Sequence, residues 1–160
     1  MLNQQTLDQF YEYLISVMNI YAGLLPVLKD EVLYINNDDI SGLDEALKLQ
    51  QAMVFKTKNF DEKVDGFLSE LGISANNLTE TIKQLPEEEQ FRFYSFLGEF
   101  DYIMEEIAFY KNKCRELLQT KLYRIEYQIE HSGLTIATSY DENAGEINNS
   151  SYTKRYDRII

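Results

Sequence analysis

Apolar residues recur at alternating intervals of three and four over most of the chain, the spacing of one face of a helix. The first series runs from Leu7 to Ile35 and contains Pro26. A proline inside a helix removes one backbone hydrogen bond and bends the axis. Because the series stays in phase across Pro26, we predict one kinked helix here. Its apolar positions are Leu7, Phe10, Leu14, Val17, Tyr21, Leu24, Leu28 and Ile35.

Two further helices follow from the same pattern and from capping residues. The polar run at residues 36–39 can end the first helix and cap a second, which we predict from Ile40 to Leu71. Gly72 suits the position just after a helix end. Residues 74–77 offer further caps, and a short connecting helix is predicted at 78–85.

The longest apolar series predicts a third long helix from Pro86 to about His131. It begins with a proline followed by three glutamates, which is a favourable helix start. The series alternates strictly from Phe93 to Leu117 and then shifts by one residue to Leu118. A shift of this kind is a stutter, which locally unwinds a coiled coil.

These elements predict an all-α fold: an antiparallel, coiled-coil-like bundle of three long helices with a short connecting helix. We place this domain at residues 1–133. Residues 134–160 are polar and turn-like, so we predict a flexible C-terminal tail there. The tail also holds apolar residues, among them Ile136 and Tyr140, and it is either a segment that folds on a partner or a ragged terminus.

The third helix is predicted to be longer than its neighbours, which would leave apolar residues near its end uncovered. An exposed apolar stripe is typical of a partner-binding surface or an oligomer contact. Five aromatic residues also fall off the main series, either as interface residues or as a second internal stripe: Tyr94, Tyr102, Phe109, Tyr123 and Tyr127. The predicted partner-binding residues are Leu117, Leu118, Leu122, Tyr123, Ile125, Tyr127, Ile129, Ile136 and Tyr140.

The amino-acid composition excludes several kinds of partner and of chemical site. The net charge of −12, from 27 acidic and 15 basic residues, argues against nucleic acid and anionic membranes. One histidine, His131, and one cysteine, Cys114, cannot make a Cys/His zinc site or an internal disulfide. Cys114 lies on the apolar series and is expected to be a buried, inert thiol, and His131 suits a role at a helix C-terminus. No glycine-rich phosphate loop is present, so we expect no enzyme activity, cofactor or metal.

The first residues and the lengths of the apolar runs indicate the cellular compartment of the protein. The first ten residues, MLNQQTLDQF, lack the basic and apolar regions of a signal peptide. No apolar run approaches the roughly 20 residues that cross a bilayer. We therefore expect a cytoplasmic protein without membrane insertion.

Residues 24–72 resemble the core of the FlgN-type flagellar export chaperones. The matching pattern is a glutamate, an acidic turn, and a leucine-rich helix with a central glutamine and lysine that ends in Leu-Gly. The segments LTETIKQLPEEE and YKNKCRELLQTKLYRIEY are also similar to the family, although Cys114 replaces the usual asparagine, and residues 138–145 loosely match its tail. The residues that carry the pattern are Glu31, Asp38, Asp39, Ile40, Leu43, Gln51, Lys58, Leu68, Leu71, Gly72, Asn112, Arg115, Leu117 and Leu118.

The resemblance implies a cytoplasmic chaperone of the flagellar type III export apparatus. Such a protein binds the C-terminal amphipathic segments of the hook–filament junction proteins FlgK and FlgL, prevents their premature association and delivers them to the export apparatus. The implied partners are these clients and components of that apparatus. The alternative is a non-enzymatic coiled-coil scaffold or self-associating structural protein, and we expect a monomer or weak dimer.

Overall fold

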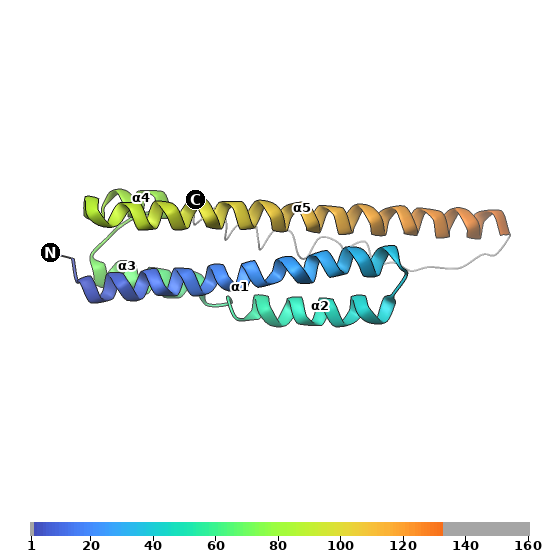
Figure 1. Cartoon of the computed structure of the whole chain (residues 1–160), viewed down its shortest axis with the longest axis horizontal. Helices are drawn as coiled ribbons and strands as arrows, with labels where there is room; N and C mark the ends of the chain where they lie inside the picture. The colour runs from blue at the N-terminus through green and yellow to red at the C-terminus, as the bar shows by residue number, and fades with distance from the viewer. Residues whose placement is uncertain (1, 133–160) are drawn as a thin grey trace. The chain divides into compact units, whose positions relative to one another are not determined.

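The structure, a computed structural model, describes residues 2–132. Within this range the chain forms helices and no strand, so the predicted all-α class is confirmed. The predicted tail, including Ile136 and Tyr140, lies outside the described residues. The helices are α1 (Gln4–Asn36), α2 (Ile40–Phe55), α3 (Phe60–Leu71), α4 (Leu78–Lys83) and α5 (Glu87–Ser132) (Figure 1).

The first and third long helices match their predictions closely. α1 continues through Pro26 as a single helix of 33 residues, and α5 extends over 46 residues from Glu87, directly after Pro86. The predicted short helix is also present as α4, although it ends at Lys83 rather than at residue 85. Gly72 closes α3 with a left-handed φ of 69°, as expected of a residue after a helix end.

The predicted second helix is wrong in one respect, because a turn at residues 56–59 divides it into α2 and α3. The last turn of α2 tightens, with the Lys56 N–H donating to the Met53 carbonyl at 3.2 Å. Thr57 is buried, and its carbonyl accepts a hydrogen bond from the Phe60 N–H at 3.1 Å. The turn brings Phe60 into a core, and this burial outweighs the continuation of a helix whose middle is polar.

The described residues form two compact units. Unit 1 comprises residues 2–17 and 57–100, which are the start of α1, all of α3 and α4, and the first part of α5. Its centre is aromatic: the Phe10 ring lies 5.3 Å from that of Phe67 and 5.8 Å from that of Phe93, between centroids. Asn77 caps α4 by accepting a hydrogen bond from the Glu80 N–H at 2.8 Å.

Unit 2 comprises residues 18–56 and 101–132, which are the rest of α1, all of α2 and the remainder of α5. Here α2 turns back along α1 (Figure 1). One core cluster joins all three helices, with Leu43, Tyr110 and Leu117 packed against buried Val32, Ile35 and Cys114. Asp39 caps α2 through its carboxylate, which accepts from the Gly42 N–H at 2.9 Å.

One described helix, α1, is long and apolar enough to be compared with a membrane span. This helix contains an 18-residue window with a mean hydropathy of 1.3, which meets the length and composition of a membrane span. The physical reason is that α1 supplies buried residues to both units, including Leu7, Phe10 and Leu28. A single helix of this kind is weak evidence for a membrane span, because core helices have the same composition.

Candidate partner-binding surfaces

Within unit 2, the end of α5 continues past the turn that joins α1 to α2 (Figure 1). The Lys121 ammonium pairs with the Asp38 carboxylate in that turn. From residue 122 to 132 every side chain is exposed except that of Ile129, which is half-buried. The last turns of α5 therefore lack the covering helices that its earlier turns have in this unit.

The structure places most of the predicted partner-binding residues on this surface. Five of them are exposed: Leu118 (47%), Leu122 (43%), Tyr123 (69%), Ile125 (52%) and Tyr127 (52%). Leu117 corrects the prediction, because it packs against the core cluster of unit 2 instead of lying uncovered. Ile136 and Tyr140 fall outside the described residues.

The exposed residues divide between two faces of α5. Leu118, Leu122, Ile125 and Ile129 follow one another at intervals of four, three and four, so they share one face. We call these four residues the α5 ridge. Tyr123 and Tyr127 lie on another face, where the Tyr127 ring stacks on His131 at 3.9 Å between centroids and the His131 Nδ1 lies 2.8 Å from the Tyr127 carbonyl oxygen.

The charge around the α5 ridge differs from that of the chain as a whole. Residues 118–132 carry two cations, Lys121 and Arg124, and two carboxylates, Glu126 and Glu130. The segment is therefore neutral in a chain of net charge −12. A neutral surface with apolar side chains can approach a partner without strong repulsion, whatever the sign of the partner's charge.

The other off-series aromatic residues are also largely exposed. Tyr94, Tyr102 and Phe109 all expose a large part of their side chains. The Phe109 ring contacts neighbours on its own helix: it lies 5.2 Å from the Tyr110 ring, and the Lys113 ammonium lies 5.9 Å from its centroid. This exposure favours the interface interpretation over a second internal stripe.

Unit 2 contains a buried polar cluster around Glu31 that the sequence pattern did not predict. Glu31 is only 4% exposed, and its Oε1 has no hydrogen-bond partner among the described residues. The Cys114 thiol lies 4.0 Å from Glu31 Oε2 and donates to the Leu28 carbonyl at 3.9 Å. The signal in the sequence was Glu31 itself, a lone carboxylate in the apolar series of the first helix.

Burial shifts the titration of all three groups in this cluster. It raises the pKa of Glu31, against the attraction of Lys111, and it lowers the pKa of Lys111. Burial, reinforced by the Glu31 carboxylate, raises the pKa of Cys114 to about 11. Because the thiolate is the reactive form, the predicted inert character of Cys114 agrees with its surroundings.

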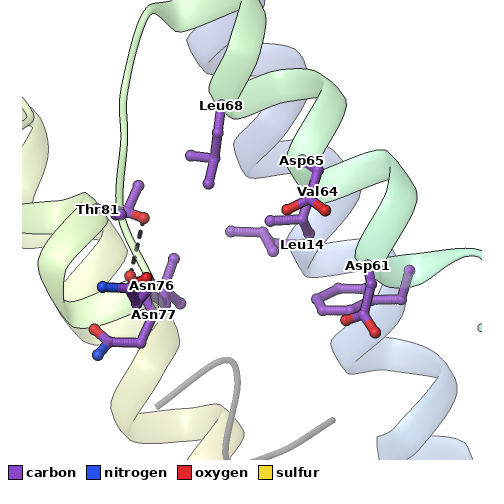
Figure 2. Close-up of a pocket in the computed structure, with 11 residues that line it drawn as sticks. Leu14, Asp61, Val64, Asp65, Leu68, Asn76, Asn77 and Thr81 are labelled. Carbon is purple, nitrogen blue, oxygen red and sulfur yellow. Dashed lines mark hydrogen bonds between the residues drawn. The ribbon is translucent and has the colours of Figure 1, made fainter.

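Unit 1 contains a cleft that the sequence reasoning did not identify (Figure 2). It has a volume of about 130 Å³ and lies between α1, α3 and the segment that leads into α4. The only local signal is a pair of aspartates one helical turn apart. The residues that line it are Leu14, Phe60, Asp61, Val64, Asp65, Leu68, Ala75, Asn76, Asn77, Leu78 and Thr81.

Comparison with known proteins finds no relative from which a function could be inferred for these surfaces. No protein-family model, curated protein or solved structure matches the chain. Among residues 2–132, no group of three or more His, Cys, Asp or Glu side chains is placed to hold a metal ion. The described surfaces and the sequence motifs are therefore the basis for a functional proposal.

Proposed function

We propose that this chain is an export chaperone of the FlgN type. It is a non-enzymatic cytoplasmic protein that binds the C-terminal amphipathic helices of the hook–filament junction proteins FlgK and FlgL. By covering these helices it prevents their premature association, and it delivers the clients to the export apparatus. The observation that carries the proposal is the α5 ridge, an apolar face near the end of α5 on which Leu118, Leu122 and Ile125 are exposed.

The geometry of the ridge suits an amphipathic helix. Leu118, Leu122 and Ile125 are spaced so that a second helix can pack along them with its own anchors at intervals of three and four. Each of the three exposes roughly half of its side chain. Covering them contributes about 2 to 4 kcal/mol, before the entropic cost of association. A contact of this size is reversible, as handover of a client requires.

The direct test is binding of purified C-terminal segments of FlgK and FlgL from the source organism, measured by calorimetry. The double variant Leu122→Glu/Ile125→Glu places two charges on the ridge. We expect it to weaken binding by about tenfold or more, since each 1.4 kcal/mol of lost contact is a factor of ten. The matched control, Gln119→Glu/Thr120→Glu, adds the same charge to the neighbouring turn of α5 but off the ridge, and is expected to bind like the native chain.

Two results would contradict the proposal. One is a native chain that binds neither segment, and the other is equal weakening by the ridge and control variants. Sedimentation of the same proteins addresses the alternative of a self-associating scaffold. A dimer that strengthens with concentration and disappears in Leu122→Glu/Ile125→Glu would assign the ridge to a second copy of the chain.

A further inference from the structure

The cleft of unit 1 combines an apolar floor, a carboxylate wall and a small volume. We propose that it is a docking pocket for a single arginine side chain presented by a partner protein. This pocket is independent of the α5 ridge, which belongs to unit 2. Three features support this proposal: the shape of the cleft, the carboxylate of Asp65, which has no partner among the described residues, and the charge of the unit that contains the cleft.

The floor of the cleft is formed by well-packed aliphatic side chains. Leu14 of α1, Leu68 of α3 and Leu78 of α4 are all buried, and Figure 2 shows Leu14 and Leu68 between the two walls. An engineered cavity of about 150 Å³ holds a benzene molecule, so the volume of about 130 Å³ found here suits one side chain rather than a larger ligand. The aliphatic stem of an arginine or lysine can lie on such a floor.

One wall of the cleft offers carboxylates. Asp61 and Asp65 are four residues apart on α3, so their side chains lie on the same side of the helix (Figure 2). Asp65 is exposed and makes no hydrogen bond or ion pair with any described residue. A carboxylate beside an apolar floor and without a cation of its own is suited to bind a cationic head group.

The opposite wall offers amide groups. Asn77 is occupied by the start of α4, because its Oδ1 accepts from the Glu80 N–H and its carbonyl accepts from the Thr81 hydroxyl at 3.0 Å. The side-chain amide of Asn76 has no hydrogen bond to any described residue, although its backbone N–H donates to Glu80. Asn76 lines the cleft together with Asn77 (Figure 2), and its Oδ1 is an acceptor without a hydrogen bond to the described residues.

Two cations of unit 1 are engaged away from the cleft. The Lys63 ammonium lies 5.2 Å from the centroid of the Tyr13 ring, and Arg92 pairs with Asp8 and Glu89. The unit as a whole has eleven carboxylates and four cationic side chains in residues 2–17 and 57–100. A partner that brings a positive charge is therefore attracted to this unit over its whole surface.

Arginine fits the acceptors better than the other cations. Its guanidinium presents five donors in a planar fork, which can bond a carboxylate and a neighbouring acceptor together, whereas a lysine ammonium is a point charge. A divalent metal ion needs more oxygen ligands than two carboxylates supply. The chemistry of the cleft therefore selects the guanidinium.

The test uses the full chain and a minimal probe, N-acetyl-arginine amide, in an NMR titration. The matched control probe is N-acetyl-citrulline amide, which has the same shape and a neutral head group. We expect saturable shifts of backbone amides at residues 61–81 with the arginine probe, with a dissociation constant on the order of 1 mM for so small a ligand. The citrulline probe should bind at least about fivefold more weakly.

Two variants locate the interaction. Asp65→Asn removes the unpaired carboxylate and should weaken arginine binding about fivefold or more. Glu70→Gln removes an exposed carboxylate of the same helix that does not line the cleft, and should leave binding unchanged. Equal binding of the two probes, shifts that do not saturate, or equal effects of the two variants would overturn the proposal.

Discussion

At the scale of single residues, the molecule contains one group whose burial opposes its charge. Glu31 has no hydrogen bond to its Oε1 among the described residues, and the nearby thiol is a weak donor. Lys111 attracts the carboxylate, but desolvation is the larger effect and raises the pKa of Glu31. An ionised carboxylate in such a place costs folding free energy, because the unfolded chain solvates it freely.

This cost makes stability depend on pH with a definite sign. Since the folded-state pKa of Glu31 is raised, its favourable contribution is complete below the unfolded pKa and is lost as pH rises through the folded pKa. The neutral variant Glu31→Gln lacks this dependence. As pH rises above 4.5, the ordinary pKa of a glutamate, we expect the native chain to lose stability relative to Glu31→Gln, by at most about 1.4 kcal/mol per pH unit.

Urea unfolding of both proteins across that range measures the difference. Lys111 is present in both proteins, and its ordinary pKa of 10.5, although lowered by burial, starts well above the acid range in which Glu31 begins to ionise. Glu62→Gln, at an exposed position on α3, controls for the loss of one negative charge. Parallel stability curves for native chain and Glu31→Gln would show that the carboxylate is solvated in the folded state.

At the scale of elements, the sequence pattern predicted what long apolar series determine and missed what contacts between distant parts of the chain decide. The bounds of α1 and α5 follow from series that remain in phase over many turns. The break at 56–59 does not, because it depends on burying Thr57 and Phe60, which only the folded unit reveals. The cleft of unit 1 was missed for the same reason, since its walls come from residues far apart in the sequence.

Two helical glycines, Gly42 of α2 and Gly66 of α3, differ in the space around their Cα atoms. A Cβ at Gly42 would lie 2.6 Å from the Asp39 carboxylate and 2.7 Å from the Tyr34 ring, whereas a Cβ at Gly66 would meet nothing within 4 Å. Gly42→Ala should therefore destabilise the protein by about 1 to 3 kcal/mol through overpacking at the α2 cap. Gly66→Ala, inside α3, should stabilise it by about 0.5 to 1 kcal/mol.

Thermal and urea unfolding of the two variants test this pair directly, and each serves as the control for the other. Their difference removes the general effect of adding a methyl group to a helix. If Gly42→Ala were as stable as Gly66→Ala, the close approach of Asp39 and Tyr34 to Gly42 would not exist in solution.

At the scale of the whole molecule, two helices are shared between two units that have separate cores. The core residues of unit 1 surround Phe10 and Phe93, and those of unit 2 surround Val32 and Cys114. Periodicity predicted part of the exposed apolar surface at the end of α5, because the length of α5 could be read from the sequence. Leu117 was assigned wrongly, since the place where α1 and α2 stop covering α5 depends on the position of their turn.

The end of α5 gives the last prediction. Residues 122–132 make few contacts with described residues, and helices that lack tertiary packing are marginal in water. We therefore expect their amides to exchange with solvent by local opening that costs about 0 to 2 kcal/mol, whereas amides at 103–114, where α5 contributes to the unit 2 core, exchange only by much larger openings. Hydrogen exchange resolved by mass spectrometry or NMR distinguishes the two segments on one molecule.

Binding of an amphipathic client helix to the α5 ridge should slow exchange at 118–129 and leave 103–114 unchanged, because only the first segment gains packing. Equal protection of both segments in the free chain would mean that the ridge is already covered, and the partner surface would then have to be sought elsewhere.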